Sequence, residues 1–594
     1  MSGTNLGYLH GLFPRSRRLG ADILWPNNII GLNESKPKNN DNLLTFLVFL
    51  LTLTVFLALF AFRALDDNRL TSWHWAFADV DVLNILFALV IGASLAHALS
   101  NISLPVRKPA IWLFISSFAA AGILWGEPEV IVDASRYFIQ AKHLELYGVG
   151  YFLREWGNDI AVWTDLPLVP FLYGLIFSVF GETRMVIQLF STLLFSGTVV
   201  LTYLIGKTLW NETVGIYGGA LLLGMPYLLT QVPLMLVDVP TMFFLTLAVF
   251  TTIKAVKQGG TGLMISASAV IVLAMLSKYS AWLMLSVVSI IFLSHLEYGW
   301  RVILRRAAVI SLGAVLLMGL VILWKFDVMA EQFSLLQSYQ IPGLGRWGES
   351  FTSTFLFQIH PFITIAALYS IYLAIKKRDL YYAIIGWMLF LVMLLEIRRT
   401  RYIILVFPML ALMASYGLTQ IKNAKLGRYI VSCTVVSTLI IAVFGYLPFL
   451  QKTSTTNIKN AGKYLNSIRA ANVEVFVLPQ TRSIINPAIS VALLDLFTEK
   501  KITYHDNSDI KPRPELIEKS PLRFTWEYEN PEFFTSGSSH ADEITAVAII
   551  FSDGNQTIPG RIARRISGYR LSREFTRLDK VFRYQTLIRV YEPA

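Results

Sequence analysis

Long apolar runs are the feature of this sequence that most limits what the chain can fold into. Runs of about 18 or more largely apolar residues recur from residue 43 to residue 449. A helix needs about 20 such residues to cross the hydrocarbon core of a bilayer. Only 15% of the 594 residues are charged, whereas about 25% are charged in soluble proteins. The sequence therefore predicts an all-α polytopic membrane protein and excludes a water-soluble enzyme, a disordered chain and a fibrous protein.

The apolar runs divide the chain into about 13 predicted transmembrane helices and their connections. Residues 1–42 are polar and lack an apolar core followed by a small-residue cleavage site, so we interpret them as a cytoplasmic tail and not as a signal peptide. The segment 43–108 holds two helices, and the others fall within 109–450. The predicted spans are 43–65, 82–100, 109–125, 184–206, 213–231, 240–256, 262–277, 280–296, 307–325, 355–376, 380–397, 402–420 and 428–449.

Lysine and arginine residues indicate which ends of the spans face the cytoplasm. With a cytoplasmic N-terminus, the basic clusters 301–306, 376–378 and 422–428 all fall on the cytoplasmic side, as the positive-inside rule requires. Residues 166–180 are apolar but too short to cross easily, and a crossing there would reverse this pattern, so we assign them to the outer membrane surface. We therefore expect a multi-pass plasma-membrane protein with a long outer loop at 126–183 and an extracytoplasmic C-terminal domain.

Residues 451–594 are predicted to form this separate, small α/β domain. Residues 473–479 and 546–552 have the composition of buried strands, and residues 588–591 are a candidate last strand. Residues 487–500 have the pattern of an amphipathic helix. Strands that alternate with helices favour an α/β arrangement. The segment contains no glycine-rich nucleotide-binding loop, and its sequence does not indicate a function.

Cysteine content and charge exclude further classes of protein. The single cysteine, Cys433, lies inside an apolar run, which excludes a disulfide framework and cysteine-based metal or redox sites. The net charge of +12 is explained by the Lys and Arg residues of the predicted cytoplasmic loops and of the tail domain. We therefore expect a lipid bilayer around the chain and no nucleic-acid partner.

Acidic residues gather at the predicted outer ends of the helices. Glu127, Glu129 and Asp133 follow the third span. Asp165 opens the surface helix, and Asp238 stands where one span gives way to the next. A carboxylate at the membrane surface can act as a general base or bind a metal ion. The ordinary alternatives are solvated loop residues for the first three and helix caps for the other two.

Basic residues on the same predicted face favour a functional interpretation of the whole set. Lys278 lies in a turn between two spans, and three arginines, Arg398, Arg399 and Arg401, lie within four residues between two others. The positive-inside rule disfavours such residues on this side, so they call for an anionic partner. Arginine binds phosphate oxygens with a fork of donors, and lysine supplies a point charge. Together with the carboxylates, these cations indicate a phosphate-bearing lipid that is handled outside the cytoplasm.

Five short motifs follow one another along residues 109–450. They are Asp133-Ala-Ser-Arg136-Tyr137, Asp165-Leu-Pro, Asp238-Val-Pro, Ser277-Lys278-Tyr279 and Arg401-Tyr402. Their order and common side of the membrane resemble the GT-C superfamily of integral-membrane glycosyltransferases, in the branch of the protein O-mannosyltransferases and lipid A aminoarabinose transferases. Many members carry Asp-Glu in the first outer loop, whereas here Ala134 follows the aspartate. Either Glu129 takes the role of that second carboxylate or no residue does.

The resemblance implies transfer of a sugar, with inversion, from a polyprenyl-phosphate donor to a hydroxyl of a protein, lipid or glycan acceptor in the cell envelope. In this interpretation Asp133 is the catalytic base that removes the acceptor proton. Asp165 and Asp238 position the acceptor or the sugar. If a divalent cation such as Mg²⁺ or Mn²⁺ takes part, Asp133 and Asp238 are its candidate ligands, and branches of the superfamily differ in this respect.

The same resemblance assigns the cations to the donor. Lys278 and Arg401, with Arg398 or Arg399 and with Tyr402 beside them, would hold the phosphate as it leaves. The resemblance also leaves further candidates, of which two have a simpler alternative: an interfacial anchor for the segment of Arg346 and a packed histidine for His360. Those further candidates are Glu129, Arg136, Tyr137, Arg346 and His360.

A polytopic transporter or flippase of a lipid-linked or anionic substrate is the alternative function. It would also have many spans and intramembrane charges. It would, however, show internal repeats or helices broken near the middle of the membrane. The sequence has no repeat of fixed period, and its charges cluster at the predicted outer helix ends.

Overall fold

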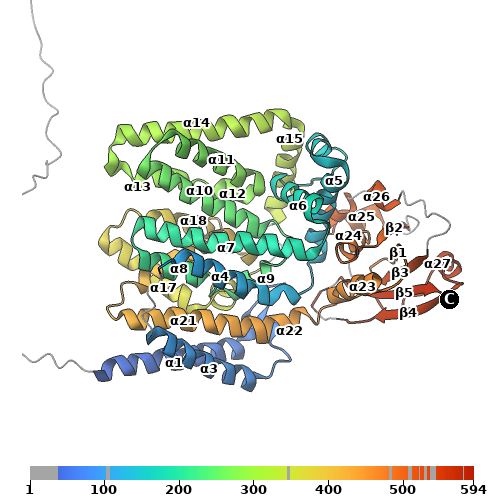
Figure 1. Cartoon of the computed structure of the whole chain (residues 1–594), viewed down its shortest axis with the longest axis horizontal. Coiled ribbons are helices and arrows are strands. Elements are labelled where there is room, and N and C mark those ends of the chain that lie inside the picture. Colours follow the sequence, from blue (N-terminus) through green and yellow to red (C-terminus); the bar gives the residue numbers. More distant parts are fainter. Residues whose placement is uncertain are drawn as a thin grey trace, which may run out of the picture.

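The chain forms a helical part and a smaller domain with a β-sheet, which lies at one end of the helices (Figure 1). This confirms the predicted fold class of a helical membrane protein with a small C-terminal α/β domain. The predicted N-terminal tail lies, up to residue 37, outside the described residues. The computed structural model describes residues 38–101, 107–343, 348–480, 484–505, 512–520, 522–527, 531–535, 544–578, 581–582 and 584–594.

Within the described residues, eight helical segments are long and apolar enough to cross a membrane. The remaining predicted spans correspond to shorter or interrupted helices, so the predicted number of 13 is not confirmed. The eight segments are 42–61 in α1 (Lys38–Ala61), α3 (Val82–Asn101), 109–126 with α4 (Pro109–Gly122), α7 (Arg184–Leu209), α10 (Asp238–Gln258), α14 (Trp300–Trp324), 400–418 with α19 (Thr400–Ile403) and α20 (Phe407–Leu418), and 424–450 with α21 (Ala424–Ile441) and α22 (Leu447–Leu450).

Proline explains one interruption. The predicted span 355–376 is broken at Pro361, where the regular helix α17 begins after an irregular turn. Proline lacks the N–H group that a continuing helix would need, but it fits the first turn of a new helix. The other helices of this part are α2 (Trp73–Ala76), α5 (Ile131–Glu155), α6 (Leu168–Phe180), α8 (Glu212–Leu222), α9 (Pro226–Gln231), α11 (Thr261–Ser277), α12 (Tyr279–Met284), α13 (Val287–Ser294), α15 (Phe326–Leu335), α16 (Ile341–Gly343), α17 (Pro361–Lys377) and α18 (Tyr382–Leu394).

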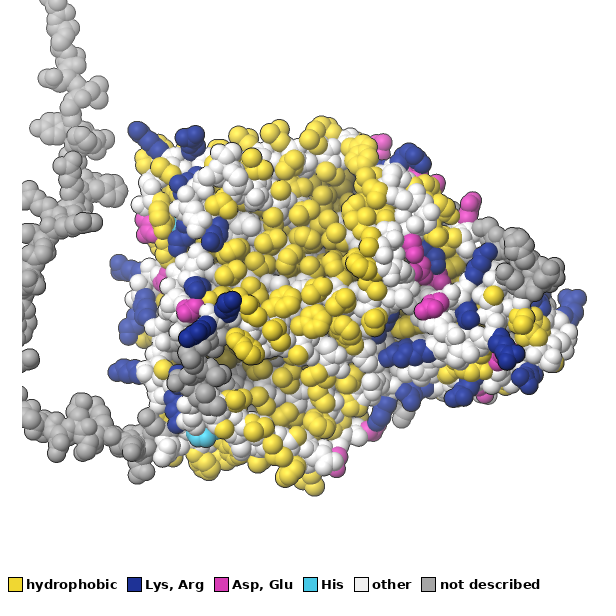
Figure 2. All heavy atoms as spheres, viewed as in Figure 1, with side chains coloured by type: hydrophobic (Ala, Val, Ile, Leu, Met, Phe, Trp, Pro, Cys, Tyr) yellow, Lys and Arg dark blue, Asp and Glu magenta, His cyan; other side chains and the backbone are white. Residues whose placement is uncertain are grey.

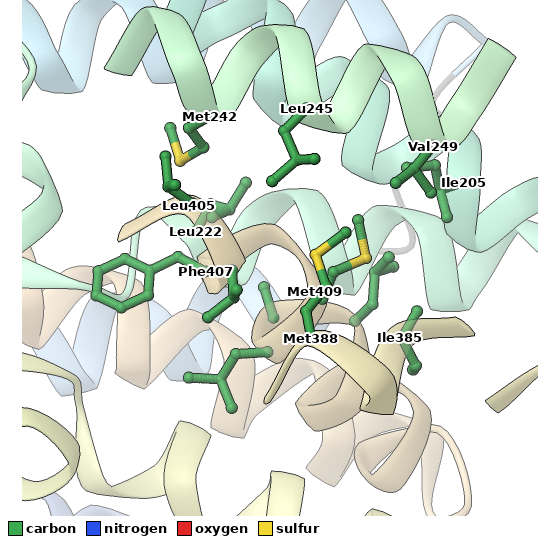
Figure 3. Packing of buried hydrophobic residues seen from close by; sticks show 14 of the residues in the cluster. Ile205, Leu222, Met242, Leu245, Val249, Ile385, Met388, Leu405, Phe407 and Met409 are labelled. Carbon is green, nitrogen blue, oxygen red and sulfur yellow. The ribbon is translucent and has the colours of Figure 1, made fainter. Parts of the chain in front are cut away.

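The segment 400–418 is the centre of the helical part. It is 94% buried, whereas the most apolar window of α14 is only 17% buried. Met409 and Phe407 pack with Met242 of α10 and Met388 of α18 in one continuous apolar cluster (Figure 3). Tight apolar packing on all sides fixes this segment in place, so the residues at its N-terminal end, 400–403, are held by the core of the molecule.

The outer surface of the helical part is apolar, as a lipid-facing surface must be. Figure 2 shows a broad hydrophobic band over the helices, with Lys and Arg side chains gathered at the end that lies away from the C-terminal domain. Leu316, Leu320 and Leu323 of α14 are among the most exposed large apolar side chains. In water such a surface would be unfavourable, and in a bilayer it is the expected one.

The predicted outer loop 126–183 contains two packed helices, α5 and α6. Helix α6 has 13 residues, whereas a membrane-spanning helix requires about 20 residues. Gly174 allows the two helices to approach closely, because a Cβ atom there would lie 2.7 Å from the carbonyl oxygen of Ala141. Phe138 and Phe177 pack across the same interface, with ring centroids 5.8 Å apart. The pair forms a compact layer between the other helices and the C-terminal domain (Figure 1).

The C-terminal domain contains a mixed five-stranded sheet in the order β2-β1-β3-β5-β4. The predicted strands correspond to its three central strands, of which β1 and β3 are parallel and β5 is antiparallel to β3. Both edge strands escaped prediction, because β2 is only four residues long and β4 is largely exposed. The elements are α23 (Thr455–Ser467), β1 (Asn472–Val477), α24 (Ile489–Leu496), β2 (Lys501–Tyr504), α25 (Pro514–Glu518), α26 (Glu532–Thr535), β3 (Thr545–Phe551), α27 (Gly560–Arg565), β4 (Tyr569–Phe575) and β5 (Leu587–Pro593).

Helix α24 differs from the predicted amphipathic helix at 487–500. It is shorter, and all eight of its residues are buried. One side packs in the core of the domain, and the other side meets α5, whose Lys142 pairs with Asp495 of α24 and lies 3.0 Å from Glu182. A helix with two covered sides needs no polar face. The C-terminal domain is therefore docked on the α5–α6 pair through apolar and ionic contacts.

The connection between α1 and α3 packs into the helical part. Asp66 accepts hydrogen bonds from the backbone N–H groups of Asn68 at 3.1 Å and Trp73 at 2.7 Å, and from Nε2 of Gln358 at 2.7 Å. Asn68 Nδ2 in turn donates to Thr400 Oγ1 at 3.4 Å. The first two helices are thus joined by a hydrogen-bonded loop to the N-terminus of α19.

Replacing Asp66 by alanine should destabilise the protein. Each buried donor that loses its acceptor costs about 1–3 kcal/mol, so we expect Asp66→Ala to lower the midpoint of thermal unfolding in detergent by several degrees. The control is Asp79→Ala, which removes an exposed carboxylate from the same connection. Equal midpoints for the two variants would show that the loop does not contribute to stability.

Candidate active site

A chain of alternating charges lies where the helical part meets the C-terminal domain. This charged chain consists of three carboxylates and three cations, and each member is ion-paired with the members next to it in space. All six were predicted as site residues, and the structure brings them together from α5, the connection before α6, the start of α10, the turn between α11 and α12, and α19. In spatial order they are Lys278, Asp238, Arg401, Asp133, Arg136 and Asp165.

Asp238 is the buried anchor of this chain. Its side chain is fully buried in the first turn of α10, where the helix dipole favours a negative charge. Lys278 Nζ lies 2.5 Å from one carboxylate oxygen, and Arg401 Nε donates to the other at 2.7 Å. A buried carboxylate is tolerated only when it is paired in this way. Asp238 therefore holds Lys278 and Arg401 in fixed positions.

Asp133 is the carboxylate of the chain that remains accessible. Its side chain is 23% exposed and accepts a hydrogen bond from Nη1 of Arg401, while Arg136 Nη2 lies 3.6 Å away. Burial raises the pKa of Asp133, but the charges of Arg401 and Arg136 outweigh burial and hold this pKa well below its usual range. Asp133 is therefore ionised at neutral pH.

Asp165 closes the chain at its other end. Arg136 Nε lies 2.7 Å from Asp165 Oδ2, and Gln140 donates to the same oxygen at 3.2 Å. Gln332 donates to the backbone carbonyl of Asp165 at 2.8 Å. Burial raises the pKa of the Asp165 carboxyl to about 6 in spite of the Arg136 charge. The sequence did not predict a role for either glutamine, because a single amide in a helix forms no recognisable pattern.

A cavity of about 1520 Å³ opens beside the charged chain. Asp133, Arg136, Asp165, Lys278 and Arg401 line it, whereas the fully buried Asp238 does not. The loop between α1 and α3 forms a second wall, and the C-terminal domain forms a third, to which Phe524, Phe582 and Tyr584 belong. The domain whose function the sequence left open therefore contributes directly to the cavity.

Two of the three arginines predicted at this site line the cavity. Arg399 Nη1 donates to the hydroxyl of Tyr402 at 3.2 Å, and the Tyr402 ring also faces Lys278 Nζ at 5.2 Å. Both Arg399 and Tyr402 line the cavity together with Arg401. Arg398 instead extends outward, where it pairs with the exposed Glu396 at 2.8 Å, and it is not a lining residue.

The further candidates are distributed differently. Tyr137 lines the cavity beside Arg136, at 3.1 Å from its Nη2. Glu129 also lines it but is paired with Arg184 at 3.2 Å. His360 lies away from the cavity, where Nδ1 accepts from the N–H of Phe362 at the start of α17 and Nε2 lies 3.0 Å from Ser437 Oγ. Arg346 falls outside the described residues.

An aromatic wall that was not predicted closes the cavity near Asp165. Trp163 packs against Phe524 of the C-terminal domain, with ring centroids 5.8 Å apart, and against Tyr339 at 5.4 Å. The guanidinium of Arg136 lies 5.4 Å from the Phe524 ring. Trp163 has a φ of +48°, a strained conformation for a large side chain, and such strain is concentrated at functional sites. Three segments distant in the sequence thus meet around Arg136.

The carboxylates of this site do not suit the divalent cation that the resemblance allowed. Asp133 and Asp238 are separated by Arg401, which is ion-paired with both. A metal ion bound by the two carboxylates would have to displace this guanidinium and would then face Arg136 and Lys278. Among the described residues, no group of three or more His, Cys, Asp or Glu side chains could hold a metal ion.

Comparisons with known proteins agree with this architecture. A family model described as dolichyl-phosphate-mannose-protein mannosyltransferase matches residues 165–324. The crystal structure of ArnT from Cupriavidus metallidurans in the apo state has a TM-score of 0.51 at 11% sequence identity and covers 81% of this chain and 97% of ArnT. The structure of the same ArnT bound to undecaprenyl phosphate has a TM-score of 0.50 at 10% identity, with the same coverage of both chains. No curated protein sequence matches this chain.

These similarities confirm the resemblance to the GT-C superfamily that the motifs predicted. At this level of identity the likeness to ArnT concerns the fold. The family match includes Asp165, Asp238 and Lys278, which are three of the six members of the charged chain. The match does not reach Asp133, Arg136 or Arg401, so the geometry of this structure is what joins them to the site.

Replacing Asp238 by asparagine tests whether the charged chain is a structural unit. Removal of one partner from a buried ion pair costs about 3–5 kcal/mol, and here two cations lose their common carboxylate. We expect Asp238→Asn to lower the midpoint of thermal unfolding strongly. The matched control is Asp327→Asn, which removes an exposed carboxylate from the first turn of α15. A midpoint within about 1 °C of that control would show that the ion pairs of Asp238 are not needed for folding.

Proposed function

We propose that this protein is a glycosyltransferase of the membrane that transfers a sugar from a polyprenyl-phosphate donor to an acceptor hydroxyl. The transfer takes place on the extracytoplasmic face and inverts the anomeric carbon. The observation that carries this proposal is the direct contact between an accessible ionised carboxylate, Asp133, and a phosphate-binding cation, Arg401, at one wall of one cavity. A base and a leaving-group site must lie this close together for a sugar to be displaced between them.

The cations of the cavity suit a lipid phosphate. Lys278, Arg399 and Arg401 line one wall, and charge-assisted hydrogen bonds from such groups bind phosphate oxygens strongly. The ArnT structure with a similar fold holds undecaprenyl phosphate. The matched family model is described by a dolichyl-phosphate sugar. Both descriptions name an isoprenoid phosphate, and the positively charged wall supports the same class of donor here.

The proposed reaction uses Asp133 as the base. The acceptor hydroxyl gives its proton to the Asp133 carboxylate as its oxygen forms the bond to the anomeric carbon. The bond from that carbon to the phosphate oxygen breaks at the same time, and the polyprenyl phosphate leaves with the electron pair. Arg401 and Lys278 stabilise the negative charge that develops on it. Because the acceptor attacks opposite the leaving group, the configuration inverts.

Donor binding would also activate the base. In the structure Arg401 holds the pKa of Asp133 low, and a carboxylate with a low pKa is a weak base. A phosphate that binds Arg401 shares the positive charge of the guanidinium, so the pKa of Asp133 rises and the carboxylate becomes more basic. This order of events would keep Asp133 inactive until a donor occupies the cavity.

Asp238 and Asp165 have different roles in this proposal. Asp238 does not line the cavity and acts through Lys278 and Arg401, which makes it a positioning residue. Asp165 lines the cavity but is bound to Arg136 and Gln140. It keeps Arg136 from pairing more closely with Asp133, and such a closer pair would lower the basicity of Asp133 further.

The distribution of charge supports an extracytoplasmic cavity. Lys and Arg gather at the end of the helices that lies away from the C-terminal domain (Figure 2), and that end faces the cytoplasm under the positive-inside rule. The alternative of a transporter is less well supported, because the charged chain lies at helix starts beside the C-terminal domain. Transporter sites usually lie near the middle of the membrane.

Replacement of Asp133 by asparagine is the main test of the proposal. Asparagine keeps the size of the side chain but cannot accept the proton, and loss of a general base costs roughly 10²–10⁴-fold in rate. We expect this loss in sugar transfer by purified Asp133→Asn protein, measured with radiolabelled polyprenyl-phosphate sugar. The control is Asp159→Asn, in the connection between α5 and α6, where the carboxylate accepts a hydrogen bond from Tyr151 at 3.2 Å. Nearly normal turnover by Asp133→Asn would remove the catalytic assignment.

Single cysteines can test the orientation. We expect a cysteine at the exposed Ser567 to react in intact cells with a thiol reagent that does not cross membranes, and a cysteine at the exposed Lys422 to remain unlabelled. The background carries Cys433→Ser, which removes the buried native cysteine. Opening the membrane should make both positions reactive. Equal labelling of both in intact cells would contradict an extracytoplasmic cavity.

A further inference from the structure

Two glutamates next to the cavity have the same burial but very different surroundings. Glu129 is 3% exposed, and its oxygens accept from Arg184 at 3.2 Å and from the backbone N–H groups of Val130 and Met235, both at 3.1 Å. Glu127 is 1% exposed, and no described residue forms a hydrogen bond or ion pair with either of its oxygens. Glu129 is thus committed to the structure, whereas Glu127 is not.

An unpartnered buried carboxyl group requires an explanation. Nearly all buried polar groups in proteins have a hydrogen-bond partner, and a group without one indicates local strain, a catalytic role, or contacts that a water, an ion or a ligand completes. Glu127 lines the same cavity as Asp133 and Arg401. A ligand in that cavity can supply the partner that the protein does not.

The surroundings of Glu127 favour a neutral group. Burial raises the pKa of the Glu127 carboxyl well above its usual value, because Arg184 and Lys459 only partly offset the cost of burial. Burial and the Arg184 charge also lower the pKa of the nearby Lys459 to about 8. The Lys459 ammonium is directed to the carbonyl oxygen of Gly126. These surroundings favour the protonated form of Glu127, which has one O–H donor and free acceptor oxygens.

We propose that Glu127 binds a hydroxyl group of the sugar carried by the lipid donor, and that it does so as both donor and acceptor of hydrogen bonds. The inference rests on the proposed function. A sugar hydroxyl also donates and accepts, so it matches a carboxylic acid with no change of charge. A phosphate is attracted instead to the cationic wall of Lys278, Arg399 and Arg401. The cavity thus has a charged region for the phosphate and a neutral region for the sugar.

The distance along the chain agrees with a ligand of this size. Four extended residues and half a helical turn separate Glu127 from Asp133, so their Cα atoms are at most about 20 Å apart. Both side chains line one cavity. One ligand that fills this cavity can therefore contact both Asp133 and Glu127.

The test compares lipids with and without a sugar. The affinity of the full-length protein in detergent is measured for undecaprenyl phosphate and for a panel of undecaprenyl-phosphate hexoses and pentoses. We define the gain as the ratio between the affinity for the most tightly bound undecaprenyl-phosphate sugar and the affinity for undecaprenyl phosphate itself. We expect Glu127→Met to reduce this gain about tenfold, which corresponds to about 1.4 kcal/mol, and to leave the affinity for undecaprenyl phosphate within about twofold of wild type.

A conservative variant and a pH series separate this role from a structural one. Glu127→Gln keeps a donor and an acceptor, so it should retain the gain. In wild type the gain should be lost as pH rises through the raised pKa, because the ionised carboxylate no longer donates. In Glu127→Gln the gain should not change with pH over the same range. The control Glu212→Gln, at an exposed carboxylate that does not line the cavity, should leave the gain unchanged.

The outcomes distinguish the two proposals. If wild type binds undecaprenyl phosphate but no sugar adds affinity, or if Glu127→Met keeps the full gain, the assignment of Glu127 is wrong and the proposed function stands. If wild type binds neither kind of lipid, the proposed function fails and the assignment fails with it.

Discussion

The site depends on one guanidinium that lies between two carboxylates. Arg401 is ion-paired with Asp238 on one side and Asp133 on the other, and the side chains of Arg401 and Asp238 are buried. Burial of so much charge is costly unless every group has a partner at close range. The alternation of charge from Lys278 to Asp165 meets this requirement, because each cation of the chain lies beside at least one carboxylate.

The fold provides this arrangement with helix starts and a rigid support. Asp133 and Asp238 lie in the first turns of α5 and α10, where the helix dipole offsets part of the cost of burial. Arg401 lies in the short helix α19, which leads into the most buried segment of the molecule. Thr400 beside it accepts from Asn68, and its N–H donates to Glu349 at 2.9 Å. Contacts from distant segments therefore hold the guanidinium in place.

The sequence predicted candidate site residues where a charged side chain stands at the end of a predicted membrane-spanning helix. Charged residues at the ends of long apolar runs are so unfavourable that they indicate a site directly, and Asp133, Asp238, Lys278 and Arg401 were predicted in this way. The GT-C resemblance and the fold class could be recognised for the same reason. The predicted number of spans could not be confirmed, since hydropathy does not show where a helix breaks, as the helix start at Pro361 illustrates.

Other features could not be predicted because they depend on packing between distant segments. Nothing in the residues around Phe524 indicates that they meet Trp163, and no local pattern separates the paired Glu129 from the unpartnered Glu127. Arg398 has the same sequence signal as its neighbours, yet it pairs with Glu396 outside the cavity. The full burial of α24 depends on α5, which covers the side of α24 that faces away from the core of its own domain.

The wall that the C-terminal domain adds to the cavity has a consequence for biosynthesis. The chain is made from its N-terminus, and domains fold largely as units as they emerge. Among the described residues, every helix that is long and apolar enough to span a membrane precedes residue 451, so Phe524, Phe582 and Tyr584 are made after all of these helices. Until the C-terminal domain has emerged and docked on α5, the cavity lacks one wall and stays open to water on that side. The order of synthesis therefore delays a closed cavity until the C-terminal domain has been made.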